Sequence, residues 1–305
     1  MAPRPPKPPG PPDLKERLDA LRAEWSGRRL DSDPLCFPHR YGDPADREVV
    51  AFLSASLAFG RVASIKASLE RLLAALGPHP AAFLDRWDGE APIPGLERFV
   101  HRWVTGKDVE DLLRRVRGAR QRHGSLGELF ARGDGAADAD YVGALSSFLS
   151  NLRSLSSFPA PFSRGLSFLL PSPSSTSALK RQHLFLRWMI RSEGFDLGLW
   201  RGGGFSPARL LLPMDTHVHR ISRYLGLTRR RSADLAASRE ATAFLRRLDP
   251  RDPVSYDWAL SRLGILAECS GLPARRHCGR CAIASVCHDR VGPPGPRSEE
   301  RALTA

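Results

Sequence analysis

Four of the five cysteines in this chain lie within nineteen residues near its carboxyl end. They are Cys269, Cys278, Cys281 and Cys287, with eight, two and five residues between consecutive members. Loops this short allow four thiolates to converge on one point, which a regular helix or strand does not. We therefore predict that these four side chains bind a single metal centre and that the rest of the chain folds around it.

The identity of the metal depends on ligand type and spacing. A structural zinc ion and a [4Fe-4S] cluster both accept four thiolates, so ligand type alone leaves both open. Zinc ribbons usually pair two Cys-x2-Cys knuckles across a longer gap, whereas this chain has one such pair, Cys278 and Cys281, within one compact loop. The spacing therefore favours a [4Fe-4S] cluster, with zinc as the alternative. Two disulfides are a further alternative, although clustered thiols in a chain of 305 residues fit a reducing compartment better.

Basic residues outnumber acidic ones, with 46 Lys and Arg against 33 Asp and Glu and a formal net charge of +13. This balance favours a polyanionic partner, above all nucleic acid, while the competing interpretation is an excess of arginine on solvated faces. Arg275, Arg276 and Arg280 lie inside the cysteine loop. We expect them to contact a phosphate backbone, the alternative being that they offset the charge of the thiolates.

The ends of the chain differ in composition from its body. Residues 1–12 are rich in proline and basic residues, so we expect a disordered tail there, and residues 292–305 are expected to form a second tail. Residues 13–291 form the body. No apolar run approaches the ~18–20 residues of a membrane span, and the N-terminus lacks the apolar segment of a signal peptide. We expect a cytoplasmic monomer with no membrane partner.

Apolar residues recur at a spacing near 3.6 along most of the body, which predicts amphipathic or buried helices. No alternating strand pattern of useful length is present, and residues 159–177, rich in Ser and Pro, are expected to form a long loop. The fold class is therefore all-α, with about ten helices. The expected helices are 14–25, 45–59, 62–76, 99–103, 109–123, 141–155, 178–191, 215–225, 232–248 and 253–268.

Three motifs, in this order along the chain, resemble those of a known family. Leu53-Ser-Ala-Ser-Leu-Ala is similar to an early helix that reads L-S-A-Q, and Met214-Asp-Thr-His-Val-His-Arg220 is similar to a V-D-T-H-V-x-R segment. The cysteine loop has the same last two spacings as that family's cluster loop, and its first spacing is two residues longer. Over residues 45–287 the chain thus resembles the endonuclease III-like helix-hairpin-helix DNA glycosylases that carry a [4Fe-4S] cluster.

The resemblance implies a fold and an activity. It implies a two-lobed helical body in which the first and last helices form the lobe of the cluster loop. Asp215 corresponds to the family's catalytic aspartate, which stabilises positive charge on the deoxyribose as the N-glycosidic bond breaks and assists the attacking water. From the residues alone, an aspartate before Thr-His-Val is as well explained as an N-cap worth about 1 kcal/mol. The implied partner is double-stranded DNA, with Lys180, Arg181 and Arg220 added to the arginines of the cysteine loop as contacts.

One segment departs from the family pattern. The hairpin reads L-P-G-x-G-x-K/T in the family, and its nearest counterpart is Leu170-Pro-Ser-Pro-Ser-Ser-Thr-Ser-Ala178. Ser172 and Ser174 replace the glycines, and Thr176 falls where a lysine would form a Schiff base; Lys180 stands four residues later. We therefore expect hydrolysis of a damaged or mispaired base without lyase activity. The alternatives are a non-catalytic nucleic-acid-binding protein and a zinc-stabilised structural protein.

Overall fold

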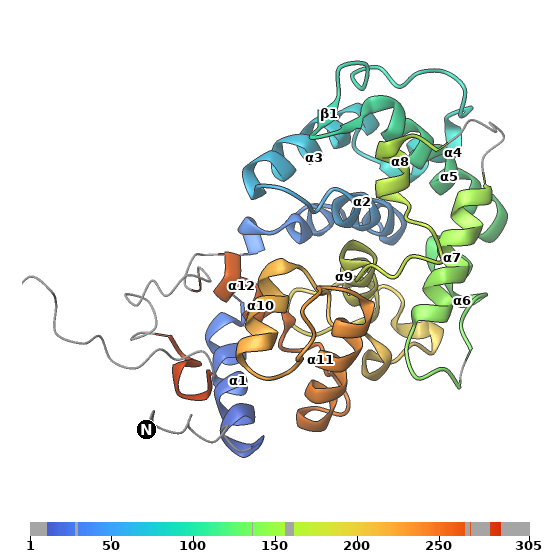
Figure 1. Cartoon of the computed structure of the whole chain (residues 1–305). Helices are drawn as coiled ribbons and strands as arrows, with labels where there is room; N and C mark the ends of the chain where they lie inside the picture. The colour runs from blue at the N-terminus through green and yellow to red at the C-terminus, as the bar shows by residue number, and fades with distance from the viewer. Residues whose placement is uncertain are drawn as a thin grey trace, which may run out of the picture.

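The computed structural model describes residues 11–27, 30–135, 137–155, 162–265, 269 and 281–287, and in these ranges the chain is mainly helical (Figure 1). The all-α class is confirmed. No helix in the described ranges is both long and apolar enough to cross a membrane. The twelve α-helices found there are α1 (Pro11–Trp25), α2 (Pro44–Ser56), α3 (Val62–Leu76), α4 (Pro80–Arg86), α5 (Gly106–His123), α6 (Leu126–Ala131), α7 (Val142–Ser154), α8 (Arg164–Leu169), α9 (Lys180–Ile190), α10 (Thr216–Tyr224), α11 (Leu235–Leu248) and α12 (Asp257–Ile265).

The buried apolar side chains form two separate cores. The first core is built by helices α2 to α9 and is centred on α2, whose residues from Asp46 to Ser56 are buried except for Arg47. The second core joins α1 to α10, α11 and α12 and to residues 281–287. In Figure 1 the blue helix α1 accordingly lies beside the orange and red helices from the other end of the chain. From Val49 to Ala55 helix α2 is apolar except for Ser54, as expected of a helix that is covered on every side.

The helix beginnings follow from local sequence. Asp43 caps α2 by accepting the N–H groups of Ala45 and Asp46, and Pro44 occupies the first helical position, where no N–H is needed. Helix α1 begins at Pro11 for the same reason, so the helix includes the last two residues that the composition assigned to the tail. Thr105 and Asp108 form a capping box at the start of α5, and Gly124 ends that helix with a φ of 87°.

The expected helix over residues 99–103 is wrong. This stretch is a β-hairpin in which β1 (Val100–His101) pairs with β2 (Val104–Thr105) across a two-residue turn. Arg102 occupies the turn with a φ of 57°, a left-handed conformation that costs a non-glycine residue on the order of 1 kcal/mol. The apolar spacing was misleading because Phe99 and Val104 are buried from a hairpin that packs on the first core. Residues 164–169, expected within a loop, form helix α8.

A buried ionic network connects the two cores. Arg187 of α9, in the first core, pairs with Asp257 at the start of α12, in the second core, and with Asp196 at 3.0 Å. Arg191 extends the network to Asp196 and, at 2.8 Å, to Asp252. Burial alone would lower the pKa of Arg187, but the two carboxylates beside it outweigh burial and raise that pKa. The network therefore joins α9 to α12 through ion pairs that are buried between the two cores.

His183 of α9 is fully buried, and neither ring nitrogen has a hydrogen-bond partner among the described residues. Burial lowers the pKa of this imidazole to about 4. As the pH falls from about 6.5 to about 4, the unfolded chain gains a proton at His183 that the folded chain does not accept, which removes about 3 kcal/mol of stability. We expect His183→Leu to remove this loss. Urea unfolding of the wild type and of His183→Leu at several pH values measures this loss of stability. If the free energies of unfolding of the two proteins fall in parallel as the pH is lowered, His183 is not its cause.

Candidate functional site

Lys180 and Asp215 meet at the beginnings of two helices. Lys180 is the first residue of α9, whose apolar side chains belong to the first core, and Asp215 is the N-cap of α10, which belongs to the second. The Lys180 Nζ lies 3.8 Å from the Asp215 Oδ2, and the side chains are 30% and 25% exposed. The pair therefore lies at the boundary between the cores and is open to solvent. Figure 1 shows both helices in the middle of the molecule.

The two oxygens of Asp215 have different neighbours. Oδ1 accepts hydrogen bonds from the N–H groups of His217 and Val218, each at 2.9 Å. This is the geometry of an N-cap, which satisfies two of the free donors at the start of α10. Oδ2 points instead toward the Lys180 amine. The interpretation of Asp215 as an N-cap is thus correct, and capping uses only Oδ1, so Oδ2 can interact with another group.

The ionic network approaches the Lys180 and Asp215 pair through Asp257. Burial raises the pKa of Asp257, and the Arg187 guanidinium opposes that shift. The charges of Asp215 and Lys180 also act on Asp257, so these residues share one electrostatic environment. The Lys180 and Asp215 pair therefore lies within electrostatic range of the buried network.

The serine-rich segment from Leu170 to Leu179 leads directly to Lys180. Its hydroxyl groups bond to one another, with 2.9 Å between the Ser172 Oγ and the Ser174 Oγ, and its backbone meets the start of α11, where the Leu235 N–H donates to the Thr176 carbonyl at 3.2 Å. Leu179 then turns into α9 with a φ of 45°. The sequence comparison put Thr176 in the place of the family's lysine, but it is Lys180 that reaches Asp215.

Arg181 and Arg220, two of the expected nucleic-acid contacts, donate hydrogen bonds within the protein. The Arg181 guanidinium donates to the carbonyls of Ser56 and Phe168, and burial lowers the pKa of Arg181 to about 10. Arg220 of α10 donates to the carbonyl of Cys269 at 2.5 Å. Both arginines are half-buried. These hydrogen bonds give the two arginines structural roles, and Arg220 links α10 to the first cysteine of the cluster.

Three of the four clustered cysteines lie in described parts of the chain. Cys269 and Cys281 are partly buried against the second core, and the Cys269 N–H donates to the Leu263 carbonyl at 3.0 Å. Cys287 follows the short helix η6 (Ala284–Val286). Cys278 lies outside the described residues, as do Arg275, Arg276 and Arg280. Within the described ranges no three His, Cys, Asp or Glu side chains gather as a ligand set. The soft thiolate donors, two of them against one core, are compatible with a four-thiolate centre.

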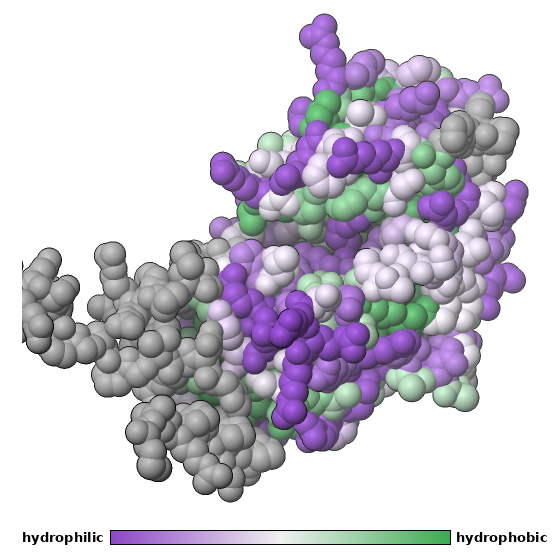
Figure 2. All heavy atoms as spheres, in the orientation of Figure 1, coloured by the Kyte–Doolittle hydropathy of each residue, from purple (hydrophilic) through white to green (hydrophobic). Residues whose placement is uncertain are grey.

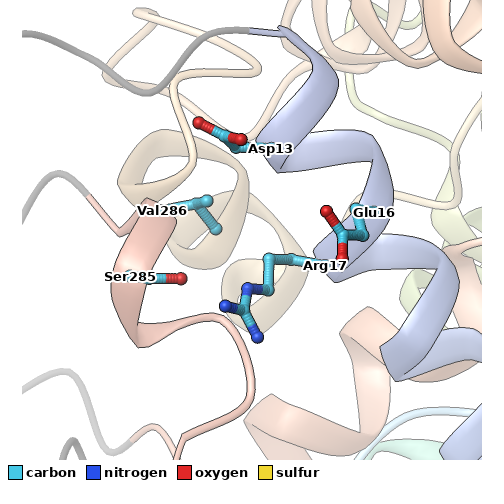
Figure 3. A pocket seen from close by; sticks show the side chains of 5 residues that line it. All are labelled: Asp13, Glu16, Arg17, Ser285 and Val286. Carbon is cyan, nitrogen blue, oxygen red and sulfur yellow. The ribbon is translucent and has the colours of Figure 1, made fainter.

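A pocket of about 260 Å³ separates η6 from α1. Figure 3 shows its lining, in which Asp13, Glu16 and Arg17 come from α1 and Ser285 and Val286 come from η6. Its lining mixes two carboxylates with one guanidinium and includes neither Lys180 nor Asp215. We therefore interpret this pocket as a gap where the cysteine segment packs on α1, rather than as a substrate site.

An exposed basic cluster, which sequence reasoning missed, lies at the end of α10 and in the residues after it. It consists of Arg223, Arg229, Arg230 and Arg231, all exposed. The imidazole of His219 in α10 is 3.0 Å from the Arg230 carbonyl and so ties the cluster to the helix that Asp215 caps. Figure 2 shows strongly hydrophilic side chains over α10 and α11, and the surface is hollowed between them and the part formed by α2, α3 and α8. The run of three arginines was the sequence signal for this surface.

Comparison with curated proteins and with solved structures gave no match. Comparison with known protein families gave one match, over residues 33–266. The matched range begins before α2 and extends through α12, so it contains Lys180, Asp215 and the buried ionic network, and it ends before the cysteine loop. The chain therefore belongs to the family described as "Protein of unknown function (DUF2400)".

Proposed function

We propose that this protein binds DNA and hydrolyses the N-glycosidic bond of a damaged or mispaired base. The observation that carries the proposal is the contact between Lys180 and Asp215, which brings a cation and a carboxylate together, exposed to solvent, at the boundary of two helical cores. The two-lobed arrangement expected of helix-hairpin-helix glycosylases would place its aspartate at such a boundary. The exposed arginines after α10 supply positive charge for a phosphate backbone.

In the proposed reaction the target nucleotide is flipped out of the duplex to reach Asp215. The bond between C1′ and the base breaks, and its electron pair leaves with the base. Positive charge then develops on the sugar, and the Asp215 Oδ2 stabilises it as the carboxylates of glycoside hydrolysis do. Water adds its hydroxyl to C1′, and its proton goes to the departing base. The Lys180 cation, 3.8 Å from the Asp215 Oδ2, would offset the carboxylate charge that the reaction needs, so we expect a DNA phosphate to draw Lys180 away from Asp215.

A second candidate reaction is favoured by the position of Lys180. The Lys180 nitrogen could attack C1′ itself once its ammonium has given up a proton, forming a C–N bond as the base leaves with the electron pair of the broken bond and takes a proton from the amine. The sugar ring would then open, with the remaining amine proton going to O4′, and leave a Schiff base. Monofunctional hydrolysis stays our first proposal because the hairpin glycines that would hold the DNA backbone are serines here. The two reactions differ in one product, the covalent bond between protein and DNA.

The four cysteines remain the proposed ligands of a [4Fe-4S] cluster, with zinc as the alternative. A bound cluster would supply no chemistry to base release and would hold the carboxyl-terminal segment in a fixed shape. Cys269 is already tied to α10 through Arg220 and to α12 through Leu263. In this proposal the cluster loop stiffens the side of the molecule that carries Asp215, and its arginines add contacts to DNA.

The test is incubation of the protein with a panel of duplexes, each with one damaged or mispaired base, followed by alkaline cleavage at any abasic site. We expect release of at least one base, and no covalent complex after borohydride reduction. A reduced complex that is lost in Lys180→Met would favour the Schiff-base reaction. Salt-sensitive duplex binding with no base released from any substrate would contradict catalysis and favour the non-catalytic alternative.

A further inference from the structure

Three aromatic side chains from distant parts of the chain form a surface cluster beside α9. Phe59 follows α2, Trp103 is in the β-hairpin, and Phe168 is in α8. The ring centres lie 5.4 Å apart for Phe59 and Trp103, 4.7 Å for Phe59 and Phe168, and 4.9 Å for Trp103 and Phe168. All three side chains are half-buried. The aromatic contacts inside the first core differ, since Phe130 and Phe148 are fully buried.

Arginines surround the aromatic cluster. The Arg102 guanidinium lies 5.2 Å from the Trp103 ring centre and that of Arg164 lies 5.5 Å from it, both within cation–π range. Both arginines are exposed, and among the described residues neither forms a salt bridge. Arg181, the residue after Lys180, lies 3.9 Å from the Phe168 ring centre. The aromatic cluster is therefore surrounded by cations, and one of them, Arg181, is the residue next to Lys180 in α9.

The hairpin is held in place by a buried histidine. The His101 ring lies 2.9 Å from the Phe59 carbonyl through Nε2 and 2.9 Å from the Ser68 hydroxyl through Nδ1. The Arg102 side chain crosses Gly60, where an added Cβ would lie 3.3 Å from the Arg102 Cδ. These contacts fix the turn against the end of α2. Trp103 and Arg102 are thus presented on a rigid support, which reduces the entropy lost when a ligand binds.

We propose that Phe59, Trp103 and Phe168, with Arg102 and Arg164, form a stacking platform for the unpaired bases of single-stranded DNA. Proteins that bind single strands combine aromatic rings, on which bases stack, with cations that contact the backbone. The platform has both, and Arg181, which packs on Phe168, follows Lys180 in the chain. The choice of DNA as the partner rests on the proposed function. The hairpin then has a role that the glycosylase resemblance does not supply, because none of the three motifs that carry the resemblance includes residues 99–105.

The test is titration of the full-length protein with an oligothymidylate that carries one 2-aminopurine, whose fluorescence is quenched when it stacks. We expect binding with quenching for the wild type. Trp103→Leu and Phe168→Leu should each raise Kd roughly tenfold and restore fluorescence, because loss of one base–aromatic contact has an effect of about this size. The matched control is Phe244→Leu, since Phe244 is also half-buried beneath an arginine, with Arg247 4.3 Å from its ring centre. It should bind as the wild type does.

A change in the turn separates binding from stability. At a φ of 57° glycine is relaxed, so Arg102→Gly should fold at least as well as the wild type. It should nevertheless bind the oligonucleotide more weakly, and the slope of log Kd against log salt should fall by about 0.7, the value for one phosphate contact on a single strand.

Three outcomes would overturn the proposal that this platform binds single-stranded DNA. The first is no binding of the oligothymidylate by the wild type, and the second is equal Kd and equal quenching in the Trp103→Leu, Phe168→Leu and Phe244→Leu variants. The third is that the wild type binds a matched oligouridylate more tightly than the oligothymidylate. Base release from duplexes is measured separately. The platform and the proposed reaction can therefore fail independently.

Discussion

Asp215→Asn is expected to lower base release by roughly 100-fold or more while leaving the folded state almost as stable as the wild type. Asparagine is as good an N-cap as aspartate, and its amide oxygen can accept the N–H groups of His217 and Val218 as Oδ1 does now. The change removes the negative charge at Oδ2, where the proposed reaction needs it. Measuring released base and urea unfolding on the same preparation separates the two roles.

Asp43→Asn is the matched control for this substitution. Asp43 caps α2 by accepting N–H groups two and three residues ahead, the same pattern as at Asp215, and it belongs to no proposed site. Both variants should unfold within about 0.5 kcal/mol of the wild type, but only Asp215→Asn should lose activity. Asp215→Ala should lose activity and, in addition, about 1 kcal/mol of stability. Equal activity in Asp215→Asn and the wild type would leave the aspartate as a cap alone.

Arg187→Met is expected to destabilise the protein by about 3–5 kcal/mol, because it leaves the buried carboxylates of Asp196 and Asp257 without their cation. Urea unfolding at neutral pH measures the effect. Burial already raises the pKa of Asp257, and loss of Arg187 removes an interaction that opposes this rise. A carboxyl with a raised folded pKa destabilises more as the pH rises. The deficit of the variant relative to the wild type should therefore shrink as the pH is lowered.

Two further variants show whether the destabilisation of Arg187→Met comes from unpaired buried charge. Adding Asp257→Asn to Arg187→Met should recover part of the stability, because a neutral amide replaces one of the two unpaired buried carboxylates. Lys15→Met breaks an ion pair with Asp19 whose side chains are 47% and 32% exposed, so it should change stability by less than about 1 kcal/mol. Similar losses for Lys15→Met and Arg187→Met, or no recovery in the double variant, would show that the network does not connect the cores as described.

Most helices could be predicted from local patterns. Val62–Leu76 has the expected bounds, and Asp43, Asp215 and the Thr105 capping box mark starts that depend only on neighbouring residues. The short helices α4, α6 and α8 and the hairpin at residues 100–105 were missed. In the hairpin the buried His101 and the strained Arg102 are stabilised by Phe59, Gly60 and Ser68, which lie more than thirty residues earlier in the chain. The spacing of apolar residues within a short stretch does not report such long-range contacts.

The candidate site was only partly predictable. Asp215 was identified from its motif, but its partner Lys180 lies 35 positions earlier and was assigned to DNA contact instead. Arg181 and Arg220 were expected to face nucleic acid, and the structure has them bonded to backbone carbonyls. Composition reports how many arginines a chain has, and it does not report which of them lie against another part of the protein.

The sequence by itself determined the helical class, the helix caps and the cysteine spacing, because each depends on residues within a few positions of one another. The tertiary structure decided that Lys180 meets Asp215, that Arg187 joins the two cores, and that three separated aromatic rings share one surface. The physical reason is the same in each case. These contacts join residues from tens to more than a hundred positions apart. The two ion pairs form only where the two helical cores lie in one relative position, and the three rings meet only where the end of α2, the hairpin and α8 pack together in the first core.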